Sequence, residues 1–134
     1  MELRLESYQN QNLPDYWDPY YTYAIYVGQD RVGTIILREG TVERRYYDGH
    51  IGYTIDPPYR GHSYALCATL LVLSIAKQKG FKTLVITCNP DNIASKKTIQ
   101  KLSATYVETR MVPRKLQKYF DRQDRYKEIY LIHL

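Results

Sequence analysis

The sequence is poor in cysteine and histidine, the residues that most often bind transition metals. Its 134 residues include 2 cysteines, 3 histidines and a single tryptophan. Cys67 and Cys88 have neither the spacing of a zinc site nor that of a redox pair, and we expect both to be small buried hydrophobic residues in a reducing compartment. The histidines are scattered at positions 50, 62 and 133. The sequence therefore predicts no metal site.

Signals for export and membrane insertion are also missing. The N-terminal residues MELRLE do not place a basic region before an apolar one, as a secretory leader does. No apolar stretch approaches the roughly 20 residues that cross a bilayer. Hydrophobic residues make up 44% of the chain and charged residues 25%, which is ordinary for a soluble domain. We expect a cytoplasmic protein with one domain over residues 1–134 and no membrane partner.

Acidic residues are scarce near the C-terminus, and this makes the whole chain basic. The formal net charge is +5. Residues 110–127, called the basic segment below, contain seven basic residues and two aspartates, so 7 − 2 = +5 and the rest of the chain is neutral. A short amphipathic helix near Leu116, Tyr119 and Phe120 is plausible from their spacing. Such a charged face is usually solvated. Attraction of an anionic ligand and contact with RNA are alternatives, but no nucleic-acid-binding motif is present, so nucleic acid is not an expected partner.

Hydrophobic patterns order the chain as a mixed α/β domain with a mostly antiparallel sheet. Alternating and β-branched runs predict strands at 20–28, 32–38, 50–55, 81–88, 106–112 and 128–134. Helical spacing predicts helices at 64–79 and 93–102. Leu66, Leu70 and Leu73 recur in a run that is apolar on nearly every face, so the first helix should be mostly buried. This helix would carry the chain from the strand at 50–55 to a parallel neighbour at 81–88.

The joint before the first helix has the features of an anion-binding site. Residues 57–71 read PPYRGHSYALCATLL. A turn from a strand into a helix leaves several N–H groups without intrahelical acceptors, at the positive end of the helix dipole. Gly61 allows close approach of the backbone, and Arg60 and His62 add positive potential, which favours a phosphate. The alternative is that Ser63 caps the helix and Gly61 only permits the turn.

This joint and the segment after it resemble the core of the GNAT acyltransferase superfamily. In that family a loop of the pattern Q/R-x-x-G-x-G/A holds the pyrophosphate of acetyl-CoA. Here the loop is Arg60-Gly61-His62-Ser63-Tyr64-Ala65. Ser63 stands where the family usually has glycine, and its Cβ would restrict the loop if this position needs a positive φ. The resemblance covers about residues 20–134 and is strongest over 49–103.

A second motif supports the resemblance. Asn92-Ile93-Ala94-Ser95 is similar to the N-x-x-A/S start of the family's next helix. The resemblance implies that Asn92 contacts the pantetheine arm and that Ser95 lies near the cofactor. Asn92 is equally suited to be a helix N-cap.

The resemblance implies an N-acetyltransferase that moves an acetyl group from acetyl-CoA directly to an amine, without a metal. The family's β-α-β-α core binds the acyl-CoA, and the backbone of Tyr53, Thr54 and Ile55 would hold the pantetheine and the thioester oxygen. His50 is the predicted catalytic base, because its ordinary pKa suits proton removal near neutral pH. Glu43 and Tyr53 are weaker candidates for the base, and a surface histidine at the start of a strand is the alternative for His50.

Two departures from the family pattern leave the activity open. Many members carry a tyrosine, the acid for the leaving thiolate, where this chain has Ile99; Tyr64, Tyr106 or water would have to replace it. The helical region that normally follows the first strand is reduced to residues 8–20, where aromatic residues would form a wall of the acceptor site or only fix the loop to the sheet: Tyr16, Trp17, Tyr20 and Tyr21.

The reduced wall implies an open cleft or one completed by a second subunit, as in a homodimer. The acceptor amine is not identified by the sequence. The alternatives to an enzyme are an acyl-CoA-binding module without turnover and, third, a basic adaptor for RNA or protein that keeps only the fold.

Overall fold

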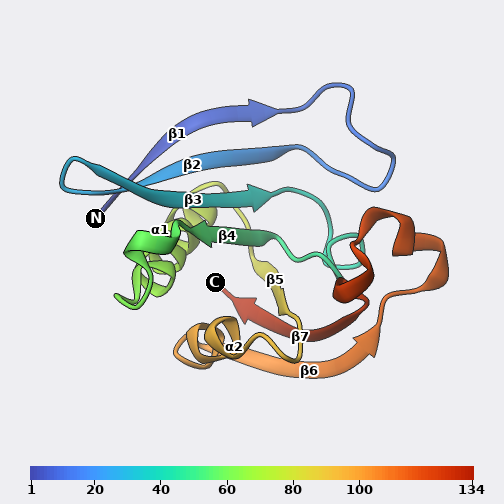
Figure 1. Ribbon diagram of the computed structural model, residues 1–134. Coiled ribbons are helices and arrows are strands. Elements are labelled where there is room, and N and C mark those ends of the chain that lie inside the picture. The colour runs from blue at the N-terminus through green and yellow to red at the C-terminus, as the bar shows by residue number, and fades with distance from the viewer.

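Two antiparallel sheets form the framework of the computed structural model, which describes residues 1–134 (Figure 1). The first sheet has the order β1-β2-β3-β4 and the second the order β5-β7-β6. All pairings within them are antiparallel. The strands are β1 (Glu2–Gln9), β2 (Tyr20–Val27), β3 (Asp30–Arg38), β4 (Ile51–Ile55), β5 (Thr83–Cys88), β6 (Ala104–Met111) and β7 (Tyr126–His133).

Two helices connect these strands. Helix α1 (Tyr64–Gln78) leads from β4 to β5, and α2 (Ile93–Gln100) leads from β5 to β6. No helix interrupts the β1–β2 connection, as expected from its prolines and lack of helical periodicity. Short 3-10 turns lie at Pro57–Tyr59, Arg114–Tyr119 and Arg122–Asp124. Neither helix is long and apolar enough to span a bilayer.

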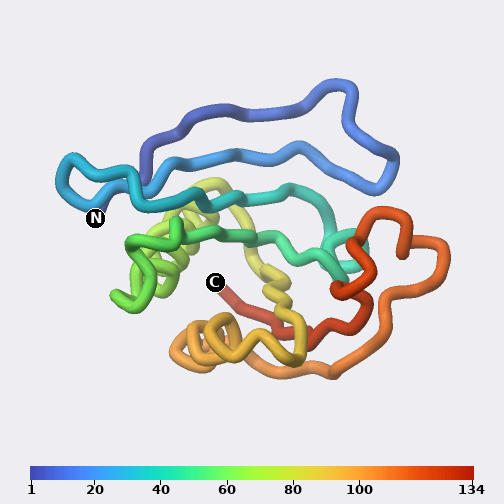
Figure 2. The backbone as a smooth tube through the Cα atoms, in the orientation of Figure 1, coloured from blue at the N-terminus to red at the C-terminus, as the bar shows by residue number.

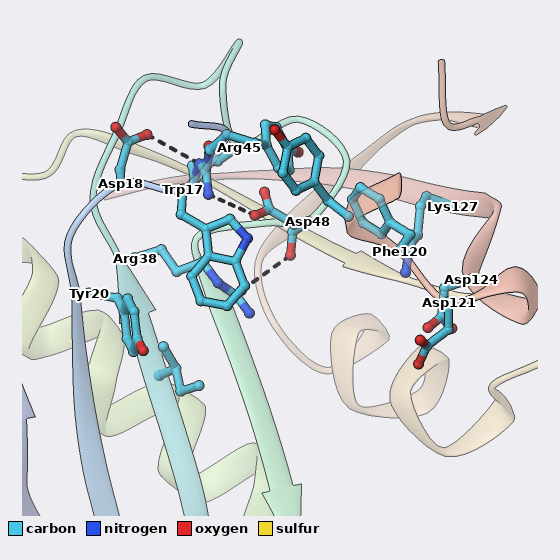
Figure 3. Close-up of a pocket in the computed structure, with 13 residues that line it drawn as sticks. Trp17, Asp18, Tyr20, Arg38, Arg45, Asp48, Phe120, Asp121, Asp124 and Lys127 are labelled. Carbon is cyan, nitrogen blue, oxygen red and sulfur yellow. Dashed lines mark hydrogen bonds and ion pairs between the residues drawn. The ribbon is translucent and has the colours of Figure 1, made fainter. Parts of the chain in front are cut away.

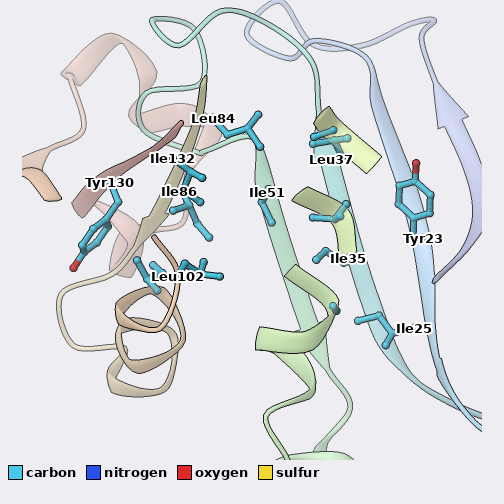
Figure 4. Packing of buried hydrophobic residues seen from close by; sticks show 14 of the residues in the cluster. Tyr23, Ile25, Ile35, Leu37, Ile51, Leu84, Ile86, Leu102, Tyr130 and Ile132 are labelled. Atoms are coloured by element: carbon cyan, nitrogen blue, oxygen red, sulfur yellow. The ribbon is translucent and has the colours of Figure 1, made fainter. Parts of the chain in front are cut away.

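The core lies between α1 and the two sheets (Figure 4). Alternation along β3 sends Ile35 and Leu37 into this core and leaves Ile36 and Arg38 on the opposite face of the sheet. Side chains from both sheets meet here, among them Ile25, Ile51, Leu84, Ile86 and Ile132. The predicted elements are confirmed with end points shifted by a few residues.

Two expectations about burial were wrong. Helix α1 buries only Ala68, Thr69, Val72 and Ala76, while Leu70 is 52% exposed, because the helix lies against the sheets on one side only. Cys67 is exposed on the same helix, and only Cys88 is a buried thiol.

The basic segment folds back beside residues 39–49, as the tube in Figure 2 shows. It does so through a second small cluster, in which Leu116 and Phe120 pack against Tyr47 and Val112. The apolar residues predicted for an amphipathic helix thus do face inward, but the helix is a 3-10 turn. The cations at positions 114, 115, 118, 122 and 125 are exposed to solvent.

His50 joins the two sheets. Its backbone N–H donates to the Val85 carbonyl at 2.8 Å, which is the only backbone hydrogen bond between the sheets. Its ring fills the joint as well: Nδ1 accepts from the Val85 N–H at 2.9 Å, so Nε2 carries the proton and donates to the Gly40 carbonyl at 2.8 Å. The residue is 1% exposed. Beyond this point β4 and β5 are not paired.

Replacing His50 with phenylalanine should destabilise the fold. His50→Phe keeps a ring of similar size but leaves the Val85 N–H and the Gly40 carbonyl unpaired in the interior, which should cost about 2 to 4 kcal/mol in the free energy of unfolding. Urea denaturation measures this loss. His133→Phe, on the exposed end of β7, is the matched control and should change stability little.

The same variant should alter the pH dependence of stability. Burial lowers the pKa of His50 from its ordinary value near 6.5. Below that pH the unfolded chain binds a proton that the folded chain does not, so His50 makes the wild type lose stability as the pH falls. The stability difference between wild type and His50→Phe should therefore shrink from about pH 7 to pH 5. A difference that stays constant over this range would contradict a buried neutral imidazole.

Candidate functional site

Six consecutive amides before and within the first turn of α1 have no acceptor in the chain. The first amide that is bonded is that of Cys67, which donates to the Ser63 carbonyl at 3.1 Å; the N–H groups of residues 61–66 donate to nothing. Ser63 does stand at the N-cap position of α1, but its side chain makes no cap hydrogen bond and so leaves these amides free. Unpaired amides at the positive end of a helix bind anions, and phosphates in particular.

Backbone conformation produces this arrangement. Gly61 has φ +89°, and a Cβ there would meet no atom within 4 Å, so glycine is required by conformation and not by space. Ser63 has φ 60° and ψ 25°, the left-handed region that disfavours side chains with a Cβ. The position where the resemblance expects glycine therefore does need a positive φ, and serine occupies it under strain.

The loop forms one wall of a groove of about 820 Å³ between β4 and α2. Every residue predicted to bind the cofactor lines this groove except His62, whose ring stacks on Tyr64 with centroids 5.2 Å apart. The predicted residues on its walls are Tyr53, Thr54, Ile55, Arg60, Gly61, Ser63, Tyr64, Ala65, Asn92 and Ser95. Residues of both motifs, which are far apart in the sequence, thus line one groove, as the resemblance implied.

Three hydrogen bonds hold the walls of the groove. The Tyr53 hydroxyl donates to Ser95 Oγ at 3.1 Å and so links β4 to α2. The Asn92 side chain accepts from the Ser95 N–H at 3.1 Å, which confirms it as the N-cap of α2. Arg60 Nε donates to the Ile55 carbonyl at 2.9 Å, which ties the loop to the end of β4.

Two cations in the groove were not predicted. Lys97 on α2 and Lys101, the residue that caps the end of α2, are four positions apart and both line the groove. The sequence did contain a signal for them. In a helix that begins at Ile93, residues four positions apart, such as these two lysines, lie on one face. Together with Arg60 they make the groove suited to a ligand with several phosphates.

The residues predicted for proton transfer are not in this groove. His50 lies in the joint between the sheets with both ring nitrogens engaged, so it has no free nitrogen for an amine, and its assignment as the base does not fit the structure. Ile99 is 1% exposed in the core. Tyr106 is exposed on β6, where its hydroxyl pairs with that of Thr109. Among the tyrosines considered as the acid, only Tyr64 lines the groove.

A second cavity, of about 350 Å³, opens on the other face of the β1–β4 sheet (Figure 3). We call it the aromatic cavity, because five rings line it: Tyr16, Trp17, Tyr20, Tyr119 and Phe120. Of the four aromatic residues singled out in the sequence, Tyr16, Trp17 and Tyr20 wall this cavity and Tyr21 does not, while an arginine ties the β1–β2 loop to residues 41–49. Arg44 bonds to Asp18 at 2.9 Å and to the Tyr16 carbonyl at 3.1 Å.

A buried charge network forms the floor of the aromatic cavity. The Arg45 side chain, 1% exposed, pairs with Asp48 at 2.7 Å and with Asp18 at 3.5 Å. Arg38 donates to the carbonyls of Asp48 and Gly49, and burial lowers its pKa. Burial also raises the pKa of Asp48, against the opposing effect of Arg38 and Arg45. One oxygen of Asp48 and the Tyr16 hydroxyl are buried without solvent contact, and burial together with the Asp48 carboxylate raises the pKa of Tyr16.

Arg38, which lines the aromatic cavity, reaches over β4. A Cβ on Gly52 would lie 3.3 Å from the guanidinium nitrogens of Arg38, so this side chain rests directly on the Gly52 backbone. Gly52 precedes Tyr53, where the wall of the groove begins.

Ser63→Gly should stabilise the fold. Glycine relieves the left-handed strain at this position, by up to about 1 kcal/mol in the free energy of unfolding. Ser74→Gly is the matched control, because Ser74 is exposed within α1, where glycine should instead cost about 0.5 to 1 kcal/mol. Urea denaturation compares the two, and an equal loss of stability in both variants would contradict strain at Ser63.

The fold is shared with solved acetyltransferases. The RimL ribosomal L7/L12 alpha-N-protein acetyltransferase aligns with a TM-score of 0.67 at 18% identity, over 86% of this chain and 61% of that one. The microcin C7 self immunity acetyltransferase MccE, in complex with acetyl-CoA and AMP, gives 0.65 at 19% identity over 86% and 61%. An IAA acetyltransferase from Bacillus cereus gives 0.66 at 13% identity over 86% and 78%.

The chain spans less than two thirds of the length of the RimL and MccE chains. No curated protein sequence matches it. Residues 3–105, however, match the acetyltransferase (GNAT) domain, which is more than half of the chain and includes both motifs of the groove. The chain belongs to the GNAT acetyltransferase family.

Proposed function

We propose that this chain is an N-acetyltransferase that moves an acetyl group from acetyl-CoA directly to an amine. The observation that carries the proposal is the set of free amides at residues 61–66, beside a groove built from both predicted motifs. The pyrophosphate of acetyl-CoA would accept hydrogen bonds from these amides, and Lys97 and Lys101 would add positive potential. RimL and MccE, which share the fold, are acetyltransferases by name, and MccE was solved with acetyl-CoA.

The backbone of β4 would hold the pantetheine arm and the thioester. Beyond His50 the edge of β4 that faces β5 is unpaired, so the Tyr53 and Ile55 amides and the Tyr53 carbonyl, which point away from β3, are available to a ligand, whereas the backbone groups of Thr54 point to β3. An extended pantetheine arm carries amide groups that suit such an edge. An N–H of this strand directed at the thioester oxygen would stabilise the negative charge of the tetrahedral intermediate, an effect worth about 3 kcal/mol.

Transfer would be direct, because no cysteine is placed to carry the acetyl group. Cys88 is buried and burial raises its pKa to about 11, while Cys67 does not line the groove. The amine nitrogen attacks the thioester carbon, and the carbon–sulfur bond breaks. Of the two protons that an ammonium acceptor loses, one leaves to a base or solvent and the other goes to the departing thiolate.

A cytoplasmic location remains part of the proposal.

A second function, acyl-CoA binding without turnover, is favoured by one observation. The position of the family's tyrosine acid is the buried Ile99, and His50 is not available as a base. Release of free thiol from acetyl-CoA in the presence of amines separates the two functions, since a binding module would bind acetyl-CoA and release none.

Gly61→Pro should weaken acetyl-CoA binding. Proline removes one of the free amides and cannot adopt the φ of +89° found here, so the loop loses its shape. We expect the affinity, measured by calorimetric titration, to fall at least about tenfold, the equivalent of 1.4 kcal/mol.

Gly80→Pro is the matched control. Gly80 also has a positive φ, of +94°, and open space around it, but it lies at the other end of α1, away from the groove. This variant should lose stability and keep its affinity for acetyl-CoA. Unchanged affinity in a folded Gly61→Pro protein would remove the loop from the proposed site.

A further inference from the structure

We propose that the Tyr53 hydroxyl is the acid that protonates the departing CoA thiolate, and that Ser95 is the residue that positions it. This inference rests on the proposed function, because it supplies the proton donor for the same acetyl transfer.

The direction of the groove places the thioester near Tyr53. The free amides of residues 61–66 lie at one end of the groove, where the pyrophosphate would bind. From there β4 leads back along the groove through Ile55 and Thr54 to Tyr53, the first residue of this strand that lines it. In acetyl-CoA the pyrophosphate and the thioester stand at opposite ends of the pantetheine arm. A cofactor whose pyrophosphate meets the free amides would therefore carry its sulfur toward Tyr53.

Tyr53 is the tyrosine of the groove that lies at this end. The tyrosines that line the groove are Tyr53, Tyr59 and Tyr64. Tyr59 ends the 3-10 turn just before the loop, and Tyr64 is the first residue of α1, so both lie at the phosphate end. No carboxylate, histidine or cysteine lines the groove, and its cations are suited to the phosphates. Tyr53 is thus the proton donor best placed for the sulfur.

A hydrogen bond holds the Tyr53 hydroxyl against the opposite wall. The side chain extends from β4 to the first turn of α2, where the hydroxyl donates to Ser95 Oγ at 3.1 Å. Ser95 is itself fixed, because its N–H donates to the Asn92 side chain that caps the helix. The Tyr53 ring also packs against the core cluster between the sheets. The hydroxyl is therefore held at one point of the groove before any cofactor binds.

This hydroxyl reaches the side of α2 from which a tyrosine at position 99 would project. Ile99 stands four residues after Ser95, so the two residues share one face of the helix. A long side chain on a helix leans toward the helix N-terminus, and a tyrosine at position 99 would lean toward the turn that holds Ser95. Tyr53 brings a phenol hydroxyl to the same turn from β4. The buried Ile99 therefore does not leave the groove without an acid.

The hydroxyl pair can give up a proton and recover it. As the carbon–sulfur bond breaks, its electron pair stays on sulfur, and the Tyr53 proton moves to sulfur to give the free thiol of CoA. A serine hydroxyl both donates and accepts, so the Ser95 O–H can turn and donate to the tyrosinate oxygen. The tyrosinate then takes up the second proton of the attacking amine, or one from solvent, and the phenol is restored. A positioned acid of this kind contributes about 10²- to 10⁴-fold to the rate of a reaction.

Binding of free CoA and of desulfo-CoA tests the contact with sulfur without an acceptor amine. Desulfo-CoA lacks only the sulfur atom, so the ratio of the two affinities isolates the sulfur from every other group of the cofactor. A free thiol of this kind has a pKa of about 8.5, so CoA is mostly a thiol at about pH 7 and mostly a thiolate at about pH 9. Calorimetric titration of the whole chain at these two pH values measures the ratio.

In the wild type we expect the affinity for CoA relative to desulfo-CoA to rise at least about threefold from pH 7 to pH 9, because a hydroxyl that donates to sulfur stabilises the bound thiolate. In Tyr53→Phe the ratio should stay level or fall, because the ring is kept and only the donor is lost. Tyr126→Phe, an exposed tyrosine of β7 outside the groove, is the matched control and should behave as the wild type. A level ratio in the wild type, or an equal rise in Tyr53→Phe, would overturn the inference.

Two further variants separate this role from a structural one and from another tyrosine. Ser95→Ala breaks the same hydrogen bond but keeps the Tyr53 hydroxyl, so part of the rise should remain. If Ser95→Ala and Tyr53→Phe behave alike, the hydrogen bond only ties α2 to β4, and Tyr53 is not the donor. A rise that is lost in Tyr64→Phe and kept in Tyr53→Phe would assign the acid to Tyr64 instead.

Failure of this inference is distinguishable from failure of the proposed function. A wild type that binds neither CoA nor desulfo-CoA would contradict the proposed function, and this inference with it. A wild type that binds both ligands with a ratio independent of pH would keep the proposed cofactor site and lose only the assignment of Tyr53.

Discussion

The joint at His50 determines where a ligand can bind in this molecule. One backbone hydrogen bond and one imidazole connect the two sheets. Had pairing continued, β4 and β5 would have used their edge amides and carbonyls on each other. Because pairing stops, the edge of β4 at residues 53–55 is left for a ligand, and α1 starts close to it with its own amides unpaired. A structural histidine thus lies where pairing stops, and both of its ring nitrogens are engaged in the joint.

Much of the fold could be predicted from the sequence because it depends on local rules, whereas the residues of the groove were expected from the resemblance of two motifs to the GNAT family. Strand and helix periodicity, prolines at the end of β4 and a glycine before α1 act over a few residues. Serine in place of the family's glycine at position 63 was expected to restrict the loop only if the backbone there has a positive φ, and the φ is 60°. Asn92 caps α2 by accepting from the Ser95 N–H, and Ser95 Oγ in turn accepts from the Tyr53 hydroxyl on β4.

The proton-transfer assignment could not be predicted, because it depends on which neighbours a side chain meets. His50 begins a strand in the sequence, where a ring on either face is equally plausible, and only the distant Gly40 and Val85 decide that it is buried and neutral. The burial of Leu70 was predicted wrongly for the same reason. Periodicity indicates a helix, but not how many sheets will cover it.

The aromatic cavity shows how net charge can mislead. A segment of charge +5 borders the aromatic cavity, yet most of its cations point to solvent, while its two aspartates line the cavity. Short-range contacts, and not the sum of charges, decide what a site binds, because exposed charges are screened within about 8 Å at physiological salt. The apolar residues of this segment, such as Leu116 and Phe120, fold it against the core, and that packing sets which charges face inward. The net charge of the chain therefore describes its outer surface and not the lining of the aromatic cavity.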